Sequence, residues 1–473
     1  MSPTREDPLA GALSEGVGGR LGSHAARHRW WTPARVLLVL TGVVLSLGMV
    51  QKAGCYGETW SGEQRYTQMC YSDLPYLYTG RGLAELNWPY TDDEQVRGRY
   101  QVMEYPVGIA YAAYALAWTT QTLAQTPGVE TRKQQPTDSL FGQPEIQREI
   151  RIFVIVHALL FAALALLSVW LVSRVNPGRP WDAVMFAASP ALALTFLINW
   201  DMLAIALVAG AVFTWTRGRP GWTGVLIGLG VATKLYPLFL LGGIAVICLR
   251  ERRWRDLASS LGAAVGAFVV MNAPAFVWGR DQWEVFWSFN SDRTADLGSV
   301  WLVLSQAGDW AFSAETINLW SWLLFGAWCA AVAIVGFTAP TSPRLAQLAF
   351  LIVCGFLIVN KVYSPQYVLW LLPLAVLARP RWRDQIIWQA GEVIYFASVW
   401  WYLNNDLAPA GGQDAGFYWL AIAIRVAAEL YLCAIVVRDI WWPRRDPVHA
   451  SRFEPGEPGE GQSISTPSNV VAV

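Results

Sequence analysis

Acidic, basic and amide side chains interrupt the apolar runs of this 473-residue chain at a few places, which are its candidate sites for chemistry. The first is Asp73, a single carboxylate among aromatic residues in the segment Cys-Tyr-Ser-Asp-Leu-Pro-Tyr. Partial desolvation raises the pKa of a carboxyl group and suits it to general-base catalysis. The alternative is that this aspartate only caps a helix, because aspartate is favoured at helix N-termini. Asp73 is therefore the first candidate for a catalytic base.

Further acidic and amide groups lie at the edges of apolar runs. Glu104, in Glu-Tyr-Pro, precedes an apolar segment, where it either stabilises a helix N-terminus or binds a substrate. Asn199 and Asp201 belong to an Asn-Trp-Asp motif at the end of another run, and a carboxylate there is costly unless it has a partner or a function. The acidic residues at 92–94 could hold a divalent cation, but a solvated turn is the simpler interpretation.

Two lysines are also placed within largely apolar surroundings. Lys234 precedes Leu-Tyr-Pro inside a long apolar run, and Lys361 begins Lys-Val-Tyr-Ser-Pro-Gln-Tyr-Val-Leu-Trp between two others. Tyr363 and Gln366 belong to this second motif, so polar groups are concentrated there. Two cations at one membrane surface could neutralise a phosphate group. The alternative is that the lysine side chains only extend to the membrane interface.

Four other residues are interpreted as structural. Cys55 and Cys70 share one loop, and a disulfide between them is permitted if that loop lies in an oxidising compartment; the sequence leaves open whether it forms. Arg425 and Glu429 are four residues apart in an apolar run and can pair along one helix face.

The composition is that of an integral membrane protein, because 54% of the residues are hydrophobic and only 15% are charged. The basic residues form short clusters between apolar runs, and such clusters lie on the cytoplasmic side of a membrane. Each cluster is short and flanks an apolar run, so no nucleic-acid binding is expected. The clusters lie at 27–35, 174–179, 217–219, 250–255, 344, 379–383 and 438–445.

The apolar runs predict an all-α polytopic membrane protein with about 12 transmembrane helices. If each run crosses once, both termini and all the basic clusters are cytoplasmic. This result requires that 105–124 lies on the outer surface without crossing, and that 222–249 crosses twice with a break at Lys-Leu-Tyr-Pro. The runs are 35–52, 151–173, 181–198, 202–216, 222–235, 236–249, 257–276, 319–338, 345–359, 366–378, 386–402 and 416–437.

This topology divides the chain into a membrane domain, 35–437, and two cytoplasmic tails, 1–34 and 438–473, which we expect to be disordered. A long first outer loop, 53–150, is expected to carry surface helices and the candidate base. Most of the chemistry-bearing groups then lie on one face, which indicates an enzyme acting on a lipid-linked substrate. These groups are Asp73, Glu104, Asp201, Lys234, Lys361 and Gln366.

Taken together, these motifs resemble the GT-C glycosyltransferases over roughly 35–437, and the Ser-Pro-Gln-Tyr element that begins at Ser364 is the most specific part. The chain is most similar to glycosyltransferase family 87, the actinobacterial polyprenyl-phosphate-mannose-dependent mannosyltransferases. The resemblance implies an inverting sugar transfer at the outer face of the plasma membrane, forming an α-glycosidic bond. The donor is then a polyprenyl-phosphate sugar, with mannose expected, and the acceptor is a cell-envelope glycolipid or polysaccharide such as a lipoglycan.

The resemblance also implies roles for individual residues. Asp73 aligns with the acid that takes the proton from the acceptor hydroxyl. The family often has Gly-Gln-Asn or Gly-Gln-Asp where this chain has Asn-Trp-Asp, and Tyr-Pro-Pro where it has Glu-Tyr-Pro. These departures leave the roles of Asn199, Asp201 and Glu104 in substrate binding open. No cofactor is implied, and a divalent metal stays open. The expected donor-binding residues are Lys234, Lys361, Tyr363 and Gln366.

Other activities are compatible with parts of this pattern. Related GT-C proteins resemble arabinofuranosyltransferases, which use polyprenyl-phosphate arabinose. A transporter or flippase of a lipid-linked sugar is a different class, but transporters usually show repeated halves and ionisable groups near the bilayer midplane. This chain has no convincing internal repeat, and its polar groups lie at one surface. A scaffold with a degenerate site would tolerate the loss of Asp73. The sequence gives no oligomeric state.

Overall fold

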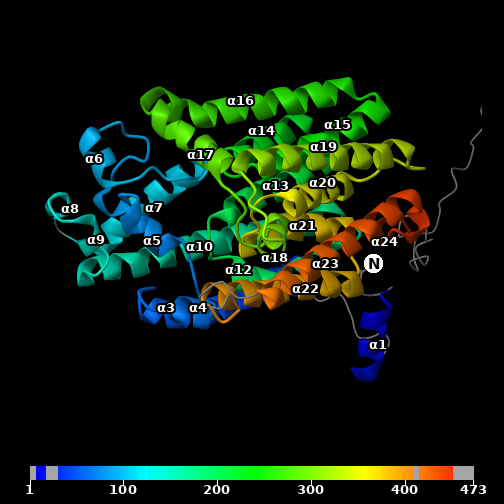
Figure 1. The fold of residues 1–473 in the computed structure, drawn as a ribbon. Coiled ribbons are helices and arrows are strands. Elements are labelled where there is room, and N and C mark those ends of the chain that lie inside the picture. The colour runs from blue at the N-terminus through cyan, green and yellow to red at the C-terminus, as the bar shows by residue number, and fades with distance from the viewer. Residues whose placement is uncertain (1–6, 18–29, 127, 408–414, 451–473) are drawn as a thin grey trace, which may run out of the picture.

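The computed structural model describes residues 7–17, 30–126, 128–407 and 415–450, and it is helical without strands over these residues. The long helices run in roughly one direction, and the short helices of the first outer loop collect at one end of them (Figure 1). The principal helices are α2 (Pro33–Gln51), α10 (Pro144–Val175), α13 (Asp201–Thr216), α14 (Pro220–Val231), α15 (Leu240–Glu251), α16 (Trp254–Trp278), α19 (Ala314–Thr338), α20 (Leu345–Val359), α21 (Val368–Ala378), α22 (Trp382–Leu403) and α23 (Gly416–Trp441).

Among the described residues, five helices are long and apolar enough to cross a membrane, namely α2, α10, α16, α19 and α23. Four shorter apolar helical segments, 201–216, 220–231, 345–359 and 365–378, lie among them. The predicted run at 181–198 is not one helix, but η2 (Pro180–Ala183), α11 (Val184–Ala187) and α12 (Pro190–Thr195). The structure is therefore that of an all-helical membrane protein, and the count of twelve crossings stays a prediction.

The apolar run 222–249 breaks where the sequence analysis expected it to break. Helix α14 ends at Val231, and the 3-10 helix η3 (Tyr236–Phe239) leads into α15. Pro237 has no backbone N–H to continue the α-helical hydrogen bonds. Lys234 lies in the connection between these helices, which has irregular backbone.

The first outer loop is folded against the bundle. Its helices are α3 (Ala53–Gly57), α4 (Gln64–Thr67), α5 (Leu74–Gly80), η1 (Leu83–Glu85), α6 (Glu94–Arg99), α7 (Val107–Ala124), α8 (Val129–Arg132) and α9 (Thr137–Leu140). A buried ion pair ties the loop to α10, since Arg132 Nη2 lies 2.6 Å from Glu149 Oε1. At the start of α7, Gly108 N donates to Ala232 O at 2.7 Å, and a Cβ at Gly108 would lie only 2.4 Å from Thr233 Cγ2. This close approach fixes the segment before α7 beside Lys234.

The helix ends that carry the basic clusters at 250–255, 344, 379–383 and 438–445 lie at the opposite end of the bundle from the outer loop (Figure 1). There Arg379 bridges Asp384 and Asp439, at 2.7 and 2.8 Å. Arg344 pairs with Asp446 at 3.0 Å. Helices from distant parts of the chain therefore present their basic residues at one end, as the expected topology requires. Which side of the membrane that end faces stays a prediction.

Both tails contain more structure than the sequence analysis expected. Within 1–34, residues 8–17 form α1 (Pro8–Val17), because Asp7 Oδ1 accepts a hydrogen bond from Leu9 N while its Oδ2 accepts one from Trp382 N. Within 438–473, α23 continues to Trp441 and is followed by η5 (Pro443–Arg445) and α24 (Pro447–Ala450). The ion pairs of Asp439 and Asp446 hold this extension on the bundle. The disorder expected for 1–6, 18–29 and 451–473 concerns residues outside the described ones.

Two helices between α16 and α19 were not predicted. They are α17 (Arg280–Asp292), which lies beside α7 of the outer loop, and α18 (Val300–Ala307), which is nearer the middle of the bundle in this view (Figure 1). The loop between them contributes to the site described below.

The predicted topology can be tested by cysteine labelling in a variant whose four free cysteines are replaced by alanine. Asp92 and Arg444 are both exposed and lie at opposite ends of the bundle. We expect Asp92→Cys to react with a membrane-impermeant thiol reagent in intact cells, and Arg444→Cys to react only after permeabilisation. The reverse pattern would contradict the expected orientation.

Candidate active site

A cavity of about 630 Å³ opens among the outer loop, the α17–α18 connection and the bundle. Side chains from segments far apart in the sequence line it. Of the residues that the sequence analysis selected, the cavity brings together Asp73, Glu104, Asn199, Lys234, Lys361 and Gln366.

Asp73 is positioned by backbone contacts to the end of the broken helix at 181–198. Ser72 Oγ donates to Leu197 O at 2.7 Å, and Asp73 N donates to Ile198 O at 2.9 Å. Asp73 precedes α5, but its side chain makes no capping hydrogen bond, so the helix-capping interpretation is wrong for the carboxylate. Its Oδ2 instead accepts hydrogen bonds from Asn199 Nδ2 at 2.6 Å and Tyr105 Oη at 3.3 Å.

The environment of Asp73 raises the pKa of its carboxyl group, chiefly because the group is buried. Hydrogen bonds from Tyr71 and Asn199 and the charge of Lys234 oppose this effect, whereas the charge of Asp201 adds to it. Among the described residues, no cation lies within ion-pair distance of Asp73. A carboxylate that is held by neutral donors and not neutralised by a cation is suited to accept a proton.

Lys234 and Asp201 form a second element of the site. Lys234 Nζ lies 3.5 Å from Asp201 Oδ1 and 5.1 Å from the centre of the Tyr105 ring. Asp201 is only 1% exposed and does not line the cavity. Its Oδ1 also accepts a hydrogen bond from Trp370 Nε1 at 2.6 Å. Asp201 therefore supports the lysine and the tryptophan from behind the cavity wall.

Lys361 lies in a loop that pairs with the α17–α18 connection. Asp296 N donates to Lys361 O, and Tyr363 N donates to Leu297 O, both at 2.8 Å. Lys361 Nζ donates to Asn318 Oδ1 at 2.6 Å. Burial lowers the pKa of this ammonium group, and the charge of Arg293 lowers it further. Lys361 is therefore held at the cavity without a carboxylate partner among the described residues.

Gln366 follows Lys361 in the same motif and belongs to η4 (Pro365–Tyr367). It is 4% exposed, and its Oε1 is buried without a hydrogen-bond partner among the described residues. It lies at the cavity wall next to Tyr367, whose ring stacks on Trp370. A role for Gln366 in donor binding stays a prediction.

The sequence analysis missed Arg293, which lines the cavity together with Lys234 and Lys361. Its guanidinium Nε donates to Asp296 Oδ2 at 2.9 Å. The charge pattern of the sequence could have identified Arg293, because this residue lies apart from the basic clusters that are expected on the cytoplasmic side. The cavity therefore holds three basic side chains from three different connections between helices.

Tyr363 is not at the cavity. Its hydroxyl donates to Glu392 Oε2 at 2.9 Å inside the bundle, and the guanidinium of Arg425 lies 3.6 Å from its ring centre. Arg425 pairs with Glu429 at 3.0 Å and donates from Nη2 to Gly298 O at 3.0 Å. This buried network supports the two paired loops that carry Arg293 and Lys361. The structure thus places Tyr363 behind the loop that was expected to bind the donor.

Glu104 lies at the cavity but already has a partner. Arg81 Nη2 lies 2.9 Å from Glu104 Oε2, and both carboxylate oxygens accept hydrogen bonds from the guanidinium. A role for Glu104 in acceptor binding stays a prediction.

Within the described part of the chain, no three or more His, Cys, Asp or Glu side chains lie close enough together to bind a metal ion. In the acidic run 92–94, Asp93 caps α6 by accepting hydrogen bonds from Gln95 N and Val96 N.

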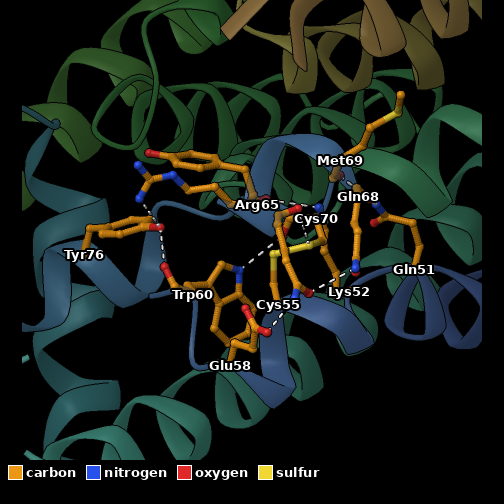
Figure 2. Close-up of a disulfide and its surroundings, with 12 residues drawn as sticks. Gln51, Lys52, Cys55, Glu58, Trp60, Arg65, Gln68, Met69, Cys70 and Tyr76 are labelled. Carbon is orange, nitrogen blue, oxygen red and sulfur yellow. Dashed lines mark hydrogen bonds between the residues drawn. A yellow bond between two sulfur atoms is a disulfide. The ribbon is translucent and has the colours of Figure 1, made fainter. Parts of the chain in front are cut away.

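Cys55 and Cys70 are joined by a disulfide bond three residues before Asp73, with their Cα atoms 5.8 Å apart. Figure 2 shows the contacts around it: Trp60 Nε1 donates to Cys70 O at 3.1 Å, and Tyr76 Oη donates to Trp60 O at 2.7 Å. The disulfide and these hydrogen bonds fix the segment that leads into the candidate base.

The fold and the site are those of a membrane-embedded enzyme with a polar cavity at one end of its helices. Residues 146–360 match the family model of glycosyltransferase family 87, which supports the family predicted from the resemblance. An all-helical membrane protein is consistent with the GT-C superfamily. The matched segment contributes Asn199, Lys234 and Arg293 to the cavity, whereas Asp73 and Lys361 lie outside it. A comparison with curated proteins gives no match.

The disulfide predicts a measurable effect on the outer loop. A closed loop of 15 residues is worth about 3 kcal/mol in the chain-entropy model. We therefore expect the double variant Cys55→Ser/Cys70→Ser to open this loop locally, so that trypsin cleaves after Arg65 faster than in the wild type. Cleavage after Arg252, at the opposite end, should not change and serves as the control. Equal cleavage rates at Arg65 would contradict a stabilising role for the disulfide.

Proposed function

We propose that this protein is an inverting glycosyltransferase that moves a sugar, mannose, from a polyprenyl-phosphate donor to a hydroxyl group of a cell-envelope glycolipid or lipoglycan. The match of residues 146–360 to glycosyltransferase family 87 supports the reaction class. The observation that carries the proposal is the juxtaposition of Asp73, which has a raised carboxyl pKa, with Lys234, Arg293 and Lys361 around one cavity. Such a site provides a base for an alcohol and positive charge for a phosphate leaving group.

The transfer is a single displacement in which Asp73 removes the proton of the acceptor hydroxyl. The acceptor oxygen attacks the anomeric carbon of the sugar, and the bond from that carbon to the phosphate oxygen breaks with inversion. A β-linked donor then gives an α-glycoside. The bonding electrons leave with the polyprenyl phosphate, whose charge rises from one minus to about two minus, and the proton stays on Asp73. Asn199 and Tyr105 orient the carboxylate throughout this step.

The three basic side chains stabilise the charge that develops on the leaving phosphate. Preorganised positive groups in a poorly solvated site are usually the largest contribution to this kind of catalysis. Asp201 and Asn318 hold Lys234 and Lys361, so neither lysine has to move to meet the charge. Lysines that are already in place are favourable because the protein spends no reorganisation energy during the reaction.

The polyprenyl chain is accommodated where the cavity meets the apolar surface of the bundle. Trp322 and Phe325 of α19 and Phe356 of α20 line the cavity near Asn318, and Trp322 is 57% exposed. An exposed aromatic side chain on an apolar helix suits contact with lipid. The isoprenoid then stays in the bilayer while its phosphate reaches the basic residues.

The charge distribution supports the proposed side of the membrane. The basic clusters lie at the end of the bundle opposite to the cavity, and such clusters remain in the cytoplasm. The proposed reaction therefore occurs at the outer face of the plasma membrane, with both termini cytoplasmic. A disulfide between Cys55 and Cys70 fits an oxidising compartment.

The base assignment predicts that Asp73→Asn lowers transfer by at least about 100-fold, since general-base catalysis is worth about 10² to 10⁴. The measurement is transfer of radiolabelled mannose from a synthetic prenyl-phosphate donor to envelope glycolipids by purified protein. Asp92→Asn, an exposed acid of the same loop, should retain activity and serves as the matched control. A folded Asp73→Asn protein with near wild-type turnover would remove Asp73 as the base, and absence of transfer by the wild type would contradict the proposed function.

The raised pKa of Asp73 predicts a particular pH dependence. Only the deprotonated carboxylate can accept a proton, so kcat/KM should fall as the pH is lowered through the pKa of this group. Because burial raises that pKa above the ordinary value of 3.8, the loss should begin at a higher pH than for an exposed aspartate. The check is a pH profile of kcat/KM over the range in which the protein stays folded. An acid limb at or below 3.8 would contradict the buried environment.

A further inference from the structure

Five aromatic rings lie next to one another at the edge of the active-site cavity. Tyr66 and Tyr71 have ring centres 6.1 Å apart with planes 16° apart, and Trp400 lies 6.2 Å from Tyr66 and 5.4 Å from Tyr71. The series continues through Tyr76 to Phe141, at 5.6 and 5.9 Å. Only Tyr66, Tyr71 and Trp400 line the cavity, and we call these three the aromatic wall.

The geometry of the aromatic wall leaves ring surface available. Near-parallel rings at these distances are offset, so neighbours cover only part of each face. Tyr66 and Tyr71 are half-buried and offer this surface, whereas Trp400 is only 3% exposed and packs behind them, with its Nε1 lacking a hydrogen-bond partner among the described residues. The rings are held firmly, because Tyr66 and Tyr71 flank the disulfide cysteine Cys70 and Trp400 belongs to α22.

The aromatic wall adjoins the base and not the cations. Tyr71 lies two residues before Asp73 and lines the cavity with it, and its hydroxyl is close enough to lower the pKa of that carboxyl group, whereas Lys361 is held from a different part of the chain by Asn318 and Ser291 O. In the proposed reaction the acceptor hydroxyl must touch Asp73, and the donor phosphate must touch the basic residues. The substrate that contacts the aromatic wall is therefore the acceptor.

We propose that Tyr66 and Tyr71, supported by Trp400, form an acceptor subsite that binds a neutral saccharide ring by stacking, and this inference rests on the proposed function. The C–H groups on one face of a pyranose ring carry partial positive charge, and the faces of aromatic rings carry partial negative charge. Stacking on Tyr66 and Tyr71, with Trp400 packed behind them, presents the edge of the sugar, with its hydroxyl groups, to Asp73. The acceptor is then a glycan-terminated molecule, and neither a serine of a protein nor a bare lipid headgroup would use this surface.

The aromatic wall can be tested by removing its ring surface while retaining apolar volume. The full-length protein in detergent would transfer radiolabelled mannose from a prenyl-phosphate donor to an octyl α-mannobioside. We expect Tyr66→Leu to raise the KM for this acceptor about tenfold, the effect of about 1.4 kcal/mol of lost binding. The KM for the donor should stay near the wild-type value, and Trp400→Leu should act in the same direction from a different element.

Two matched control variants distinguish the loss of stacking from a general disturbance of the fold. Tyr66→Phe retains the ring, and Phe141→Leu removes a ring of the same series that lies outside the cavity, so both should keep the wild-type acceptor KM. If Tyr66→Leu and Trp400→Leu are folded and keep the wild-type acceptor KM, or raise the donor KM instead, the subsite is overturned while the transferase remains. If the wild type transfers to neither this acceptor nor extracted envelope glycolipids, the proposed function itself fails.

Discussion

The position of one carboxylate, Asp73, determines how the rest of the site must be built. The carboxylate is half-buried beside an apolar bundle, where an ionised group is costly without hydrogen bonds or a partner. The structure supplies neutral donors, Asn199 and Tyr105, in place of a direct cation. Lys234 is the nearest cation in electrostatic terms, but Asp201 binds it at 3.5 Å. This division leaves the carboxylate free to accept a proton and holds the lysine in place beside the cavity, as the proposed transfer requires.

The same constraint explains why the helices of the bundle are interrupted at one end. In a membrane, irregular backbone is tolerated only where it is covered by protein or lines a polar cavity. The break after α12 presents Asn199, the break after α14 presents Lys234, and the break after α20 presents Lys361. At each break the polar groups turn toward the cavity and find partners there. The buried pair of Arg425 and Glu429 has a related role, because it supports the loops that carry Arg293 and Lys361.

The parts of this arrangement that depend on local sequence could be predicted. The break at Lys234 follows from a proline inside an apolar run, and the grouping of the polar motifs on one face follows from the basic clusters. A carboxylate among aromatic residues made Asp73 a candidate base, although the motif alone left a helix cap equally open. The disulfide could be proposed but not decided, because two cysteines in one loop are compatible with either state.

The remaining features depend on contacts between distant segments, which the sequence does not reveal. Ser72 meets Leu197 across 125 residues, and this contact is what brings the base to Asn199. Tyr363 belongs to the most specific motif, yet its hydroxyl points to Glu392 and away from the cavity. Arg293 was overlooked because its loop carries no recognisable motif. The helical structure of 438–450 was not predicted because the ion-pair partners that hold it lie in other helices.

The central claim is that this chain adds a sugar to an envelope glycan through Asp73. The most direct measurement is a mass-spectrometric profile of the envelope glycolipids and lipoglycans in a strain that lacks the gene. The strain would carry either the wild-type chain or Asp73→Asn, expressed at equal levels. We predict that one sugar unit is missing in the deletion strain, that the wild type restores it, and that Asp73→Asn does not. Equal restoration by both chains, or an unchanged profile in the deletion strain, would contradict the account.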